Sequence, residues 1–272
     1  MFYTTSKHEV MGFTKTIVLV SLTSIAKDFL KNEAKTVIIL DVNESTGTEV
    51  VNKFNQTYGE GKAVFMKCDV TKDLEDISKE IFKNYKVDIL VNNAGVADET
   101  NLRKTIEINT IAVVEWGMKF WDRMRKDNGG FGGTIINIAS IFGYMHKPWF
   151  MFYTTSKHGV MGFTKTLGHS FNYKQTGVRV IALCPGYTHT NLLNAKFNEY
   201  HEKYIINDIK SQIIQEVDVV GQAAVDVFKI AESGTAWMML CGVPLCKRFT
   251  TDGWYTRHLA DGTWHLHDMS LV

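Results

Sequence analysis

The sequence predicts an α/β fold, a doubly wound parallel sheet with helices on both faces. Short runs of aliphatic residues alternate along the chain with longer segments of helical periodicity. The short runs are apolar throughout, which is typical of parallel strands that are buried on both faces and separated by helices. The 272 residues include only three prolines and no low-complexity stretch, so we expect a single domain.

The first half of the chain supplies four predicted strands. The buried runs lie at 16–20, 36–41, 63–70 and 87–95. Helical periodicity predicts helices at 21–34, where Ser21 is the expected N-cap, and at 74–85.

The second half continues the same alternation. The pattern predicts a long helix at 106–127, a strand at 132–140, a helix at 153–170 and a strand at 178–186. The aromatic-rich stretch 254–264 lacks a clean period. We expect it to pack on the core, with a cover over a binding site or a subunit contact as alternatives.

The composition of the chain excludes several classes of binding partner. A formal net charge of +1 provides no field that would recruit nucleic acid or an anionic membrane, and no apolar run approaches the ~20 residues that cross a bilayer. The four cysteines lack framework spacing, which indicates a reduced, cytoplasmic protein. His265, His267 and Asp268 lack the further ligands that a metal site needs. We therefore expect a small-molecule partner and no metal.

Polar residues close several predicted strands, at the edge where doubly wound sheets bind ligands. They are Asp41, Asp69, Asn92 to Gly95, Ser140 and Pro185 to Thr190. An acid at the position of Asp41 accepts a hydrogen bond from the adenosine ribose and repels a 2′-phosphate, which favours NAD over NADP. A plain turn is the alternative for Asp41 and for the Asn-Asn-Ala-Gly stretch.

Ser140, Tyr153 and Lys157 form the most informative constellation. Tyr153 and Lys157 are four residues apart on a predicted helix, so they share one face. An ammonium beside a phenol favours the phenolate and should lower the pKa of Tyr153, which makes it a general base for an alcohol or a general acid for a carbonyl. Ser140, at the end of the preceding strand, can hydrogen-bond the same substrate oxygen.

The stretches DILVNNAGV, NGGFGGTIINIAS, SKHGVMGFTKT and GVRVIALCPG are specific sequence motifs. Through them the chain resembles the short-chain dehydrogenase/reductases, and within that family it is most similar to the NAD-dependent 15-hydroxyprostaglandin dehydrogenases and the insect-type alcohol dehydrogenases. The resemblance implies a Rossmann-like sheet and oxidation of a secondary alcohol to a ketone by hydride transfer to NAD. It also implies a homodimer that packs through the helices around 106–126 and 153–170.

The resemblance also assigns roles to individual residues. Tyr153 would be the acid/base, Lys157 would hold the nicotinamide ribose, Ser140 would orient the substrate oxygen, and Asn109 would anchor a proton-relay water. The NAD site would be lined by Asp41, Val42, Cys68, Asp69, Val70, Asn93, Ala94, Gly95, Tyr153, Lys157, Pro185, Gly186, Thr188, His189 and Thr190.

One family feature is missing. The first strand should lead into a glycine-rich turn, T-G-x-x-x-G-x-G, whose backbone N–H groups approach the pyrophosphate. Here SLTSIAKDFL follows Val20 directly, and no glycine occurs between Gly12 and Gly47. The hydroxyls of Ser21, Thr23 and Ser24 are a poor substitute for that loop.

The chain also contains a near-exact repeat. Residues 1–16 (MFYTTSKHEVMGFTKT) recur at 151–166 with a single difference, Glu9 against Gly159. The first copy has Tyr3 and Lys7 at the catalytic spacing, but no strand-borne serine precedes them. We interpret 1–15 as a duplicated segment and 16–272 as the dehydrogenase domain.

A second departure concerns the substrate. The prostaglandin enzymes have a glutamine three residues before the catalytic tyrosine, where this chain has Phe150. Trp149, Phe150 and Phe152 predict a more apolar wall, so prostaglandin itself is not implied.

Two hypotheses remain open from the sequence. The four catalytic residues favour an active NAD-dependent oxidoreductase. The missing glycine loop favours a non-catalytic relative that has lost cofactor binding and serves as a binding or storage protein, or as a non-functional variant.

Overall fold

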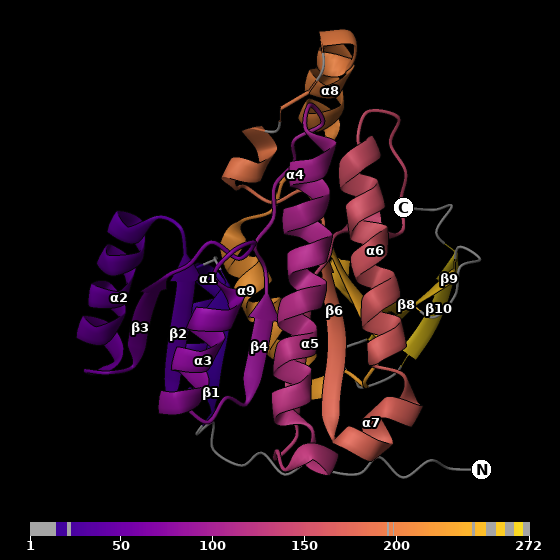
Figure 1. Ribbon diagram of the computed structural model, residues 1–272. Coiled ribbons are helices and arrows are strands. Elements are labelled where there is room, and N and C mark those ends of the chain that lie inside the picture. Colours follow the sequence, from indigo (N-terminus) through magenta and orange to yellow (C-terminus); the bar gives the residue numbers. More distant parts are fainter. Residues whose placement is uncertain are drawn as a thin grey trace, which may run out of the picture.

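Seven parallel strands form the centre of the molecule, in the order β7-β6-β5-β4-β1-β2-β3 (Figure 1). The computed structural model describes residues 15–20, 23–194, 196–197, 199–240, 243–248, 254–258 and 264–268. The strands are β1 (Thr16–Val20), β2 (Thr36–Asp41), β3 (Ala63–Lys67), β4 (Ile89–Asn92), β5 (Gly133–Ile138), β6 (Val178–Pro185) and β7 (Ala236–Leu240). The predicted doubly wound parallel sheet is confirmed.

Strand β1 lies between β2 and β4, so the strand order reverses beside it. Leu19 is in register with Ile39 on one side and with Val91 on the other. A ligand crevice is expected outside the carboxyl ends of the strands at such a reversal. The residues that follow β4 and β5 lie at this edge of the sheet, and some of them line one cavity.

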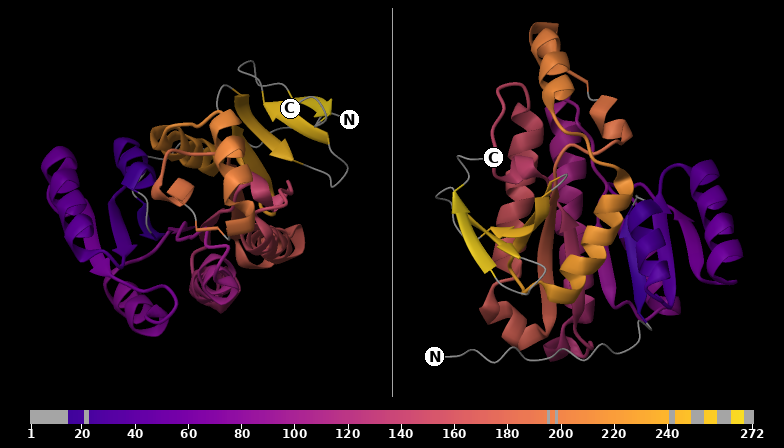
Figure 2. Two further views of the ribbon diagram at one scale, coloured as in Figure 1. Left: turned by 90° about the horizontal axis from the view of Figure 1, so that it is seen from above. Right: turned by 180° about the vertical axis from the view of Figure 1, so that it is seen from behind.

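Helices cover both faces of the sheet because its strands are apolar on both faces. Ile17 and Leu19 pack with Ile25 and Phe29 of α1 on one face, whereas Val18 packs with Trp116 of α5 on the other. The first face is covered by α1 (Thr23–Lys31), α2 (Glu44–Tyr58) and α9 (Val217–Ile230), and the second by α3 (Leu74–Asn84), α5 (Ala112–Met124) and α6 (Met151–Leu167). The two side views of Figures 1 and 2 show these two layers.

Two predicted helices differ from the observed ones. The helix predicted at 21–34 is α1, which ends at Lys31 because Glu33 adopts a left-handed backbone with φ of 62°. The single helix predicted at 106–127 is three pieces: α4 (Leu102–Ile106), a π-helical turn (Glu107–Ile111) and α5. A π-helical turn inserts a residue into the helix, which the period of the sequence does not reveal.

Other boundaries shift by a few residues. β3 and β4 stop at Lys67 and Asn92, so 68–70 and 93–95 are turn residues. The predicted helix at 153–170 begins earlier, at Met151, and ends at Leu167.

The C-terminal part of the sheet was not predicted. After α7 (Ser170–Thr176), α8 (Glu199–Ser211) and α9, the strands β8 (Val243–Arg248), β9 (Trp254–His258) and β10 (Trp264–Asp268) add to the β7 edge. They pair antiparallel, so the purely parallel sheet expected from the sequence is incomplete. The side chains of 254–264, which we expect to pack on the core, are outside the described residues. The thiols of Cys241 and Cys246 and the side chains of His265, His267 and Asp268 are outside them as well.

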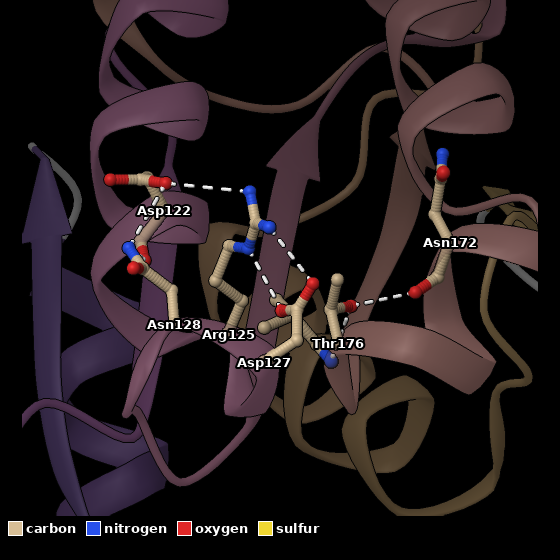
Figure 3. A network of polar contacts seen from close by, with 7 residues as sticks. Asp122, Arg125, Asp127, Asn128, Asn172 and Thr176 are labelled. Carbon is tan, nitrogen blue, oxygen red and sulfur yellow. Dashed lines mark hydrogen bonds and ion pairs between the residues drawn. The ribbon is translucent and has the colours of Figure 1, made fainter.

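Polar contacts connect residues near the ends of α5 and α7, at the amino edge of the sheet (Figure 3). Arg125 donates two hydrogen bonds to the carboxylate of Asp127, both at 2.8 Å. Thr176 donates its hydroxyl to the carbonyl oxygen of Asn172 at 2.8 Å.

Among the described residues, no helix has the length and apolarity needed to cross a membrane. The duplicated segment lies outside the described residues up to position 14.

Candidate active site

A cavity of about 330 Å³ opens where β4, β5 and β6 end and α6 begins. The structure brings many of the predicted site residues to its walls: Asn93, Gly95, Ser140, Tyr153, Lys157, Pro185, Gly186, Thr188 and Thr190. Val220 at the start of α9 also lines it, which the sequence did not predict. Residues as far apart in the chain as Asn93 and Val220 thus line one cavity.

Ser140 is held by the turn that follows β5. Its backbone is extended, and its Oγ accepts a hydrogen bond from the backbone N–H of Phe142 at 3.2 Å. Only 6% of the residue is exposed. A hydrogen bond between Ser140 and the Tyr153 side chain favours the phenolate.

Tyr153 and Lys157 lie one turn apart in α6, both buried. Desolvation raises the pKa of Tyr153 to about 12, although the hydrogen bond with Ser140 acts in the opposite direction. Desolvation also acts on Lys157, where it disfavours the charged ammonium and lowers the pKa to about 8. The expected lowering of the Tyr153 pKa by Lys157 is therefore wrong for this structure, because burial disfavours the charged forms of both groups.

Asn109 lies in the π-helical turn, and its side chain is fully buried. Its amide accepts from the Val96 N–H and donates to the Val96 carbonyl oxygen, each at 2.8 Å, and it also donates to Ser156 Oγ at 3.0 Å. Asn109 therefore ties the end of the Asn-Asn-Ala-Gly turn to α6. It lies behind Gly95, outside the cavity lining.

A chain of buried amides beneath the cavity was not predicted. Asn92 donates to Asn137 at 3.0 Å, and Asn137 donates to the hydroxyl of Thr164 at 2.9 Å. These hydrogen bonds join β4, β5 and α6. A single asparagine inside the apolar run GTIINI was the available signal for Asn137.

A second group of predicted cofactor residues lies at the ends of β2 and β3, outside the cavity lining. Asp41 accepts a hydrogen bond from the Asn43 N–H at 2.9 Å, so the turn-forming alternative is present. Asp69 contacts Thr71 and Lys72, which lower its pKa. The thiol of Cys68 is in the core, where burial raises its pKa to about 12, so only its backbone can line a site.

The remaining predicted cofactor residues differ in exposure. Val42 is 61% exposed beside Asp41, and Val70 offers its carbonyl oxygen to the Trp116 indole at 2.9 Å. Ala94 is half-buried in the turn after β4. His189 is exposed and faces Glu216 instead of the cavity, with 3.8 Å between Nδ1 and the carboxylate.

The first turn of α1 lies where the glycine-rich loop is missing. Ser21 and Leu22 are outside the described residues, and so is the side chain of Thr23. The hydroxyl of Ser24 is buried and has no hydrogen-bond partner among the described residues. It is therefore a donor available at the amino end of this helix.

Aromatic rings form one wall of the cavity. Phe142 lies 4.8 Å from Phe150 and 5.8 Å from Tyr187 between ring centroids, and Phe150 contacts Phe197 at 5.4 Å. Trp149 packs against this cluster, whereas Phe152 is outside both the cluster and the cavity lining. The predicted apolar wall is thus centred on Phe150.

Helix α8 lies beyond one end of the sheet in both side views (Figures 1 and 2). Asp208 of α8 contacts Lys147 at 2.8 Å and the hydroxyl of Tyr187 at 3.1 Å. Burial and the Asp208 carboxylate raise the pKa of Tyr187. This contact attaches α8 to the two loops that border the cavity.

Comparison with known proteins agrees with this arrangement. A family model described as short chain dehydrogenase matches residues 23–201. The 15-hydroxyprostaglandin dehydrogenase [NAD(+)] of Rattus norvegicus is 38% identical over 162 residues, 58% of this chain and 61% of that protein. The same enzyme of Bos taurus is 36% identical over 186 residues, 67% of this chain and 70% of that protein.

More distant matches extend further along the chain. Alcohol dehydrogenase 1 of Ceratitis capitata is 29% identical over 218 residues, 78% of this chain and 84% of that protein. A solved 3-ketoacyl-(acyl-carrier-protein) reductase of Brucella melitensis, complexed with NADH, superposes with a TM-score of 0.70 at 23% identity, over 84% of this chain and 97% of that one. The matched part spans less than two thirds of the rat and human prostaglandin enzymes, 61% and 65%.

Proposed function

Because this chain belongs to the short-chain dehydrogenase family, we propose that it is an oxidoreductase that uses NAD to oxidise a secondary alcohol to a ketone. One observation carries the proposal. Ser140, Tyr153 and Lys157 arrive from two different elements at the wall of a single cavity at the carboxyl edge of the sheet. That edge is where doubly wound sheets carry out ligand chemistry.

The residues present fit the nicotinamide half of the cofactor. Lys157, Asn93 and Pro185 to Thr188 all line the cavity, so they could contact a ribose and a flat ring bound there. The buried, unpartnered hydroxyl of Ser24 fits a phosphate oxygen at the first turn of α1. When bound, NAD would accept a hydride from the alcohol carbon.

Tyr153 would remove the proton of the substrate hydroxyl as the carbon gives up its hydride, and Ser140 would donate a hydrogen bond to the same oxygen. Lys157 donates to the carbonyl oxygen of Ile138 at 3.0 Å, which fixes its ammonium beside the tyrosine. Asn109, through Val96, would hold the Asn-Asn-Ala-Gly turn in place against this site. The products are a ketone, a reduced cofactor and one proton.

The cofactor preference rests on Asp41. Its carboxylate ends β2, the strand beside the reversal of strand order, and the mammalian relatives are named NAD(+) enzymes. A carboxylate there accepts a ribose hydroxyl and repels a 2′-phosphate. We propose NAD rather than NADP for this reason.

The cavity wall supports a compact, largely apolar alcohol. Phe142, Phe150 and Tyr187 line the cavity and pack together, so a substrate would meet aromatic rings there. We further propose a cytoplasmic homodimer. Leu102, Ile111, Met118 and Met151 are apolar residues of the α4–α6 region with exposed fractions of 40–48%.

The alternative of a non-catalytic relative is not favoured, since the catalytic side chains are all present and the cavity beside them is open. A direct test is to mix the purified chain with NAD and 2-propanol, 2-butanol or cyclohexanol and to follow the reduced cofactor by absorbance. Turnover that Tyr153→Phe abolishes would support the proposal. If no alcohol were turned over and calorimetry detected no NAD binding, the result would favour a non-catalytic relative over a dehydrogenase.

A further inference from the structure

The first turn of the catalytic helix carries a capping interaction that its own sequence cannot provide. The first N–H groups of any helix lack partners within the helix. Phe150 occupies the N-cap position of α6 and has no side-chain hydrogen bond to offer. The amides of Phe152 and Tyr153 are therefore left to find acceptors elsewhere.

Glu99 supplies both acceptors from more than fifty residues away. Its Oε2 accepts the Phe152 N–H at 2.9 Å, and its Oε1 accepts the Tyr153 N–H at 2.8 Å. Only 3% of Glu99 is exposed, and no basic side chain of the described residues forms an ion pair with it. A buried carboxylate is costly unless it is hydrogen-bonded, so these two amides and the positive end of α6 are what stabilise it.

The backbone of Glu99 is held as firmly as its side chain. Its N–H donates to the carbonyl oxygen of Lys196 at 2.8 Å, and the Lys196 N–H donates to Ala97 at 3.1 Å. Three residues earlier in the chain, the backbone of Val96 forms two hydrogen bonds with the side chain of Asn109. Glu99 thus lies at the meeting point of the turn after β4, the segment that leads to α8, and the helix that carries Tyr153.

We propose that Glu99 is a positioning residue, which sets the height and direction of Tyr153 relative to the cavity by holding the backbone amide of Tyr153 itself. This proposal rests on the proposed function for its kinetic consequence. A bidentate carboxylate holds the two consecutive amides more rigidly than a single acceptor does. The tyrosine hydroxyl is at the far end of a long side chain, so a small rotation of the first turn displaces it from the substrate oxygen.

The kinetic test compares Glu99→Ala, Glu99→Gln and the control Asp127→Asn, with NAD and the fastest of 2-propanol, 2-butanol and cyclohexanol. Asp127 is a carboxylate in an exposed pair with Arg125 at the opposite edge of the sheet (Figure 3). Displacement of a reacting group by about 1 Å can cost about a hundredfold in rate. We expect kcat to fall by about that factor in Glu99→Ala and less in Glu99→Gln, which keeps one acceptor. KM for NAD should stay within about twofold, and Asp127→Asn should match the wild type.

A primary deuterium isotope effect separates positioning from mere loss of folded protein. Misplacement of Tyr153 slows the chemical step, so the isotope effect on kcat should increase in Glu99→Ala. A lower kcat with an unchanged isotope effect, or a kcat that falls only in proportion to the folded fraction, would overturn the proposal.

Hydrogen exchange of the peptide containing residues 151–156 provides a readout that does not need turnover. Exchange at these amides should accelerate in Glu99→Ala and not in Asp127→Asn. Unchanged exchange would overturn the role of Glu99 even in an active enzyme. If the wild-type chain oxidised none of the alcohols, the proposed function would fail, while accelerated exchange would still support Glu99 as the residue that holds Tyr153.

Discussion

The ammonium of Lys157 donates a hydrogen bond to the carbonyl oxygen of Ile138 at 3.0 Å, at the last residue of β5. The same ammonium lies 5.6 Å from the ring centroid of Tyr153. The hydrogen bond anchors Lys157 to the sheet, and both Lys157 and Tyr153 are desolvated. Burial disfavours the charged phenolate and raises the pKa of Tyr153 to about 12.

The first prediction concerns pH. Because burial raises the pKa of Tyr153 to about 12, the phenolate needed for alcohol oxidation is a minor form at neutral pH and increases as pH rises. Oxidation should therefore accelerate from pH 7 to 9, by close to tenfold per unit if Tyr153 is the single base. Ketone reduction, which uses the neutral phenol, should not accelerate. A pH profile of kcat/KM in both directions tests this, and a flat oxidation profile would contradict it.

The second prediction separates the two copies of the repeat. Tyr153→Phe should lower alcohol oxidation by at least about a hundredfold, because a positioned acid/base contributes that much or more. Tyr3→Phe should leave the rate unchanged, because Ser140 contacts Tyr153, whereas no strand-borne serine precedes Tyr3 in the sequence. Steady-state rates of the two variants, at equal folded concentration, give the answer. Equal losses in both would mean that the assignment of the copies is wrong.

The third prediction concerns the choice between the two cofactors. The carboxylate of Asp41 should meet the 2′-phosphate of NADP with a like charge at close range, which disfavours NADP by about 2 kcal/mol or more, roughly thirtyfold. The ratio of kcat/KM for NAD and NADP measures the preference. Asp41→Asn, which retains the shape and can still accept a bond from the Asn43 N–H, should reduce that ratio. If the wild type preferred NADP, the proposal that Asp41 selects NAD would be wrong.

The fourth prediction concerns the missing glycine loop. Two or three lost charge-assisted hydrogen bonds, at roughly 1.5–3 kcal/mol each, amount to at least about a hundredfold in Kd. Insertion of a T-G-x-x-x-G-x-G turn after Val20 should tighten NAD binding by that factor and raise turnover through Tyr153. Calorimetry of both chains tests it, with thermal unfolding to check that the core is intact. Micromolar NAD affinity in the uninserted chain would show that the serine and threonine hydroxyls suffice.

The fifth prediction concerns assembly. Ile111, 47% exposed at the end of the π-helical turn, should lie in the homodimer contact, so Ile111→Glu should shift the chain to a monomer in sedimentation velocity. Ile230→Glu is the matched control, because Ile230 is 44% exposed at the end of α9 on the other face of the sheet. A wild-type monomer, or dissociation by both variants alike, would argue against this interface.

Much of the site could be predicted from local pattern. Apolar runs at 16–20 and 36–41 became β1 and β2 because strands buried on both faces need little beyond their own composition. The spacing of Tyr153 and Lys157 placed them on one helix face, and the strand before Ser140 brought it to the same edge. These conclusions depend only on the period of helices and strands and on the rule that parallel strands end together.

The rest depended on contacts between distant parts of the chain. The sequence by itself determined the six parallel strands β1 to β6, the residue types proposed for catalysis and the absence of a glycine loop. Only the tertiary structure decided that Glu99 caps the helix of Tyr153, that Asn109 lies in a π-helical turn behind Gly95, and that burial raises the pKa of Tyr153. The physical reason is that desolvation and capping across 54 residues depend on which surfaces meet, and no local period of the sequence records that.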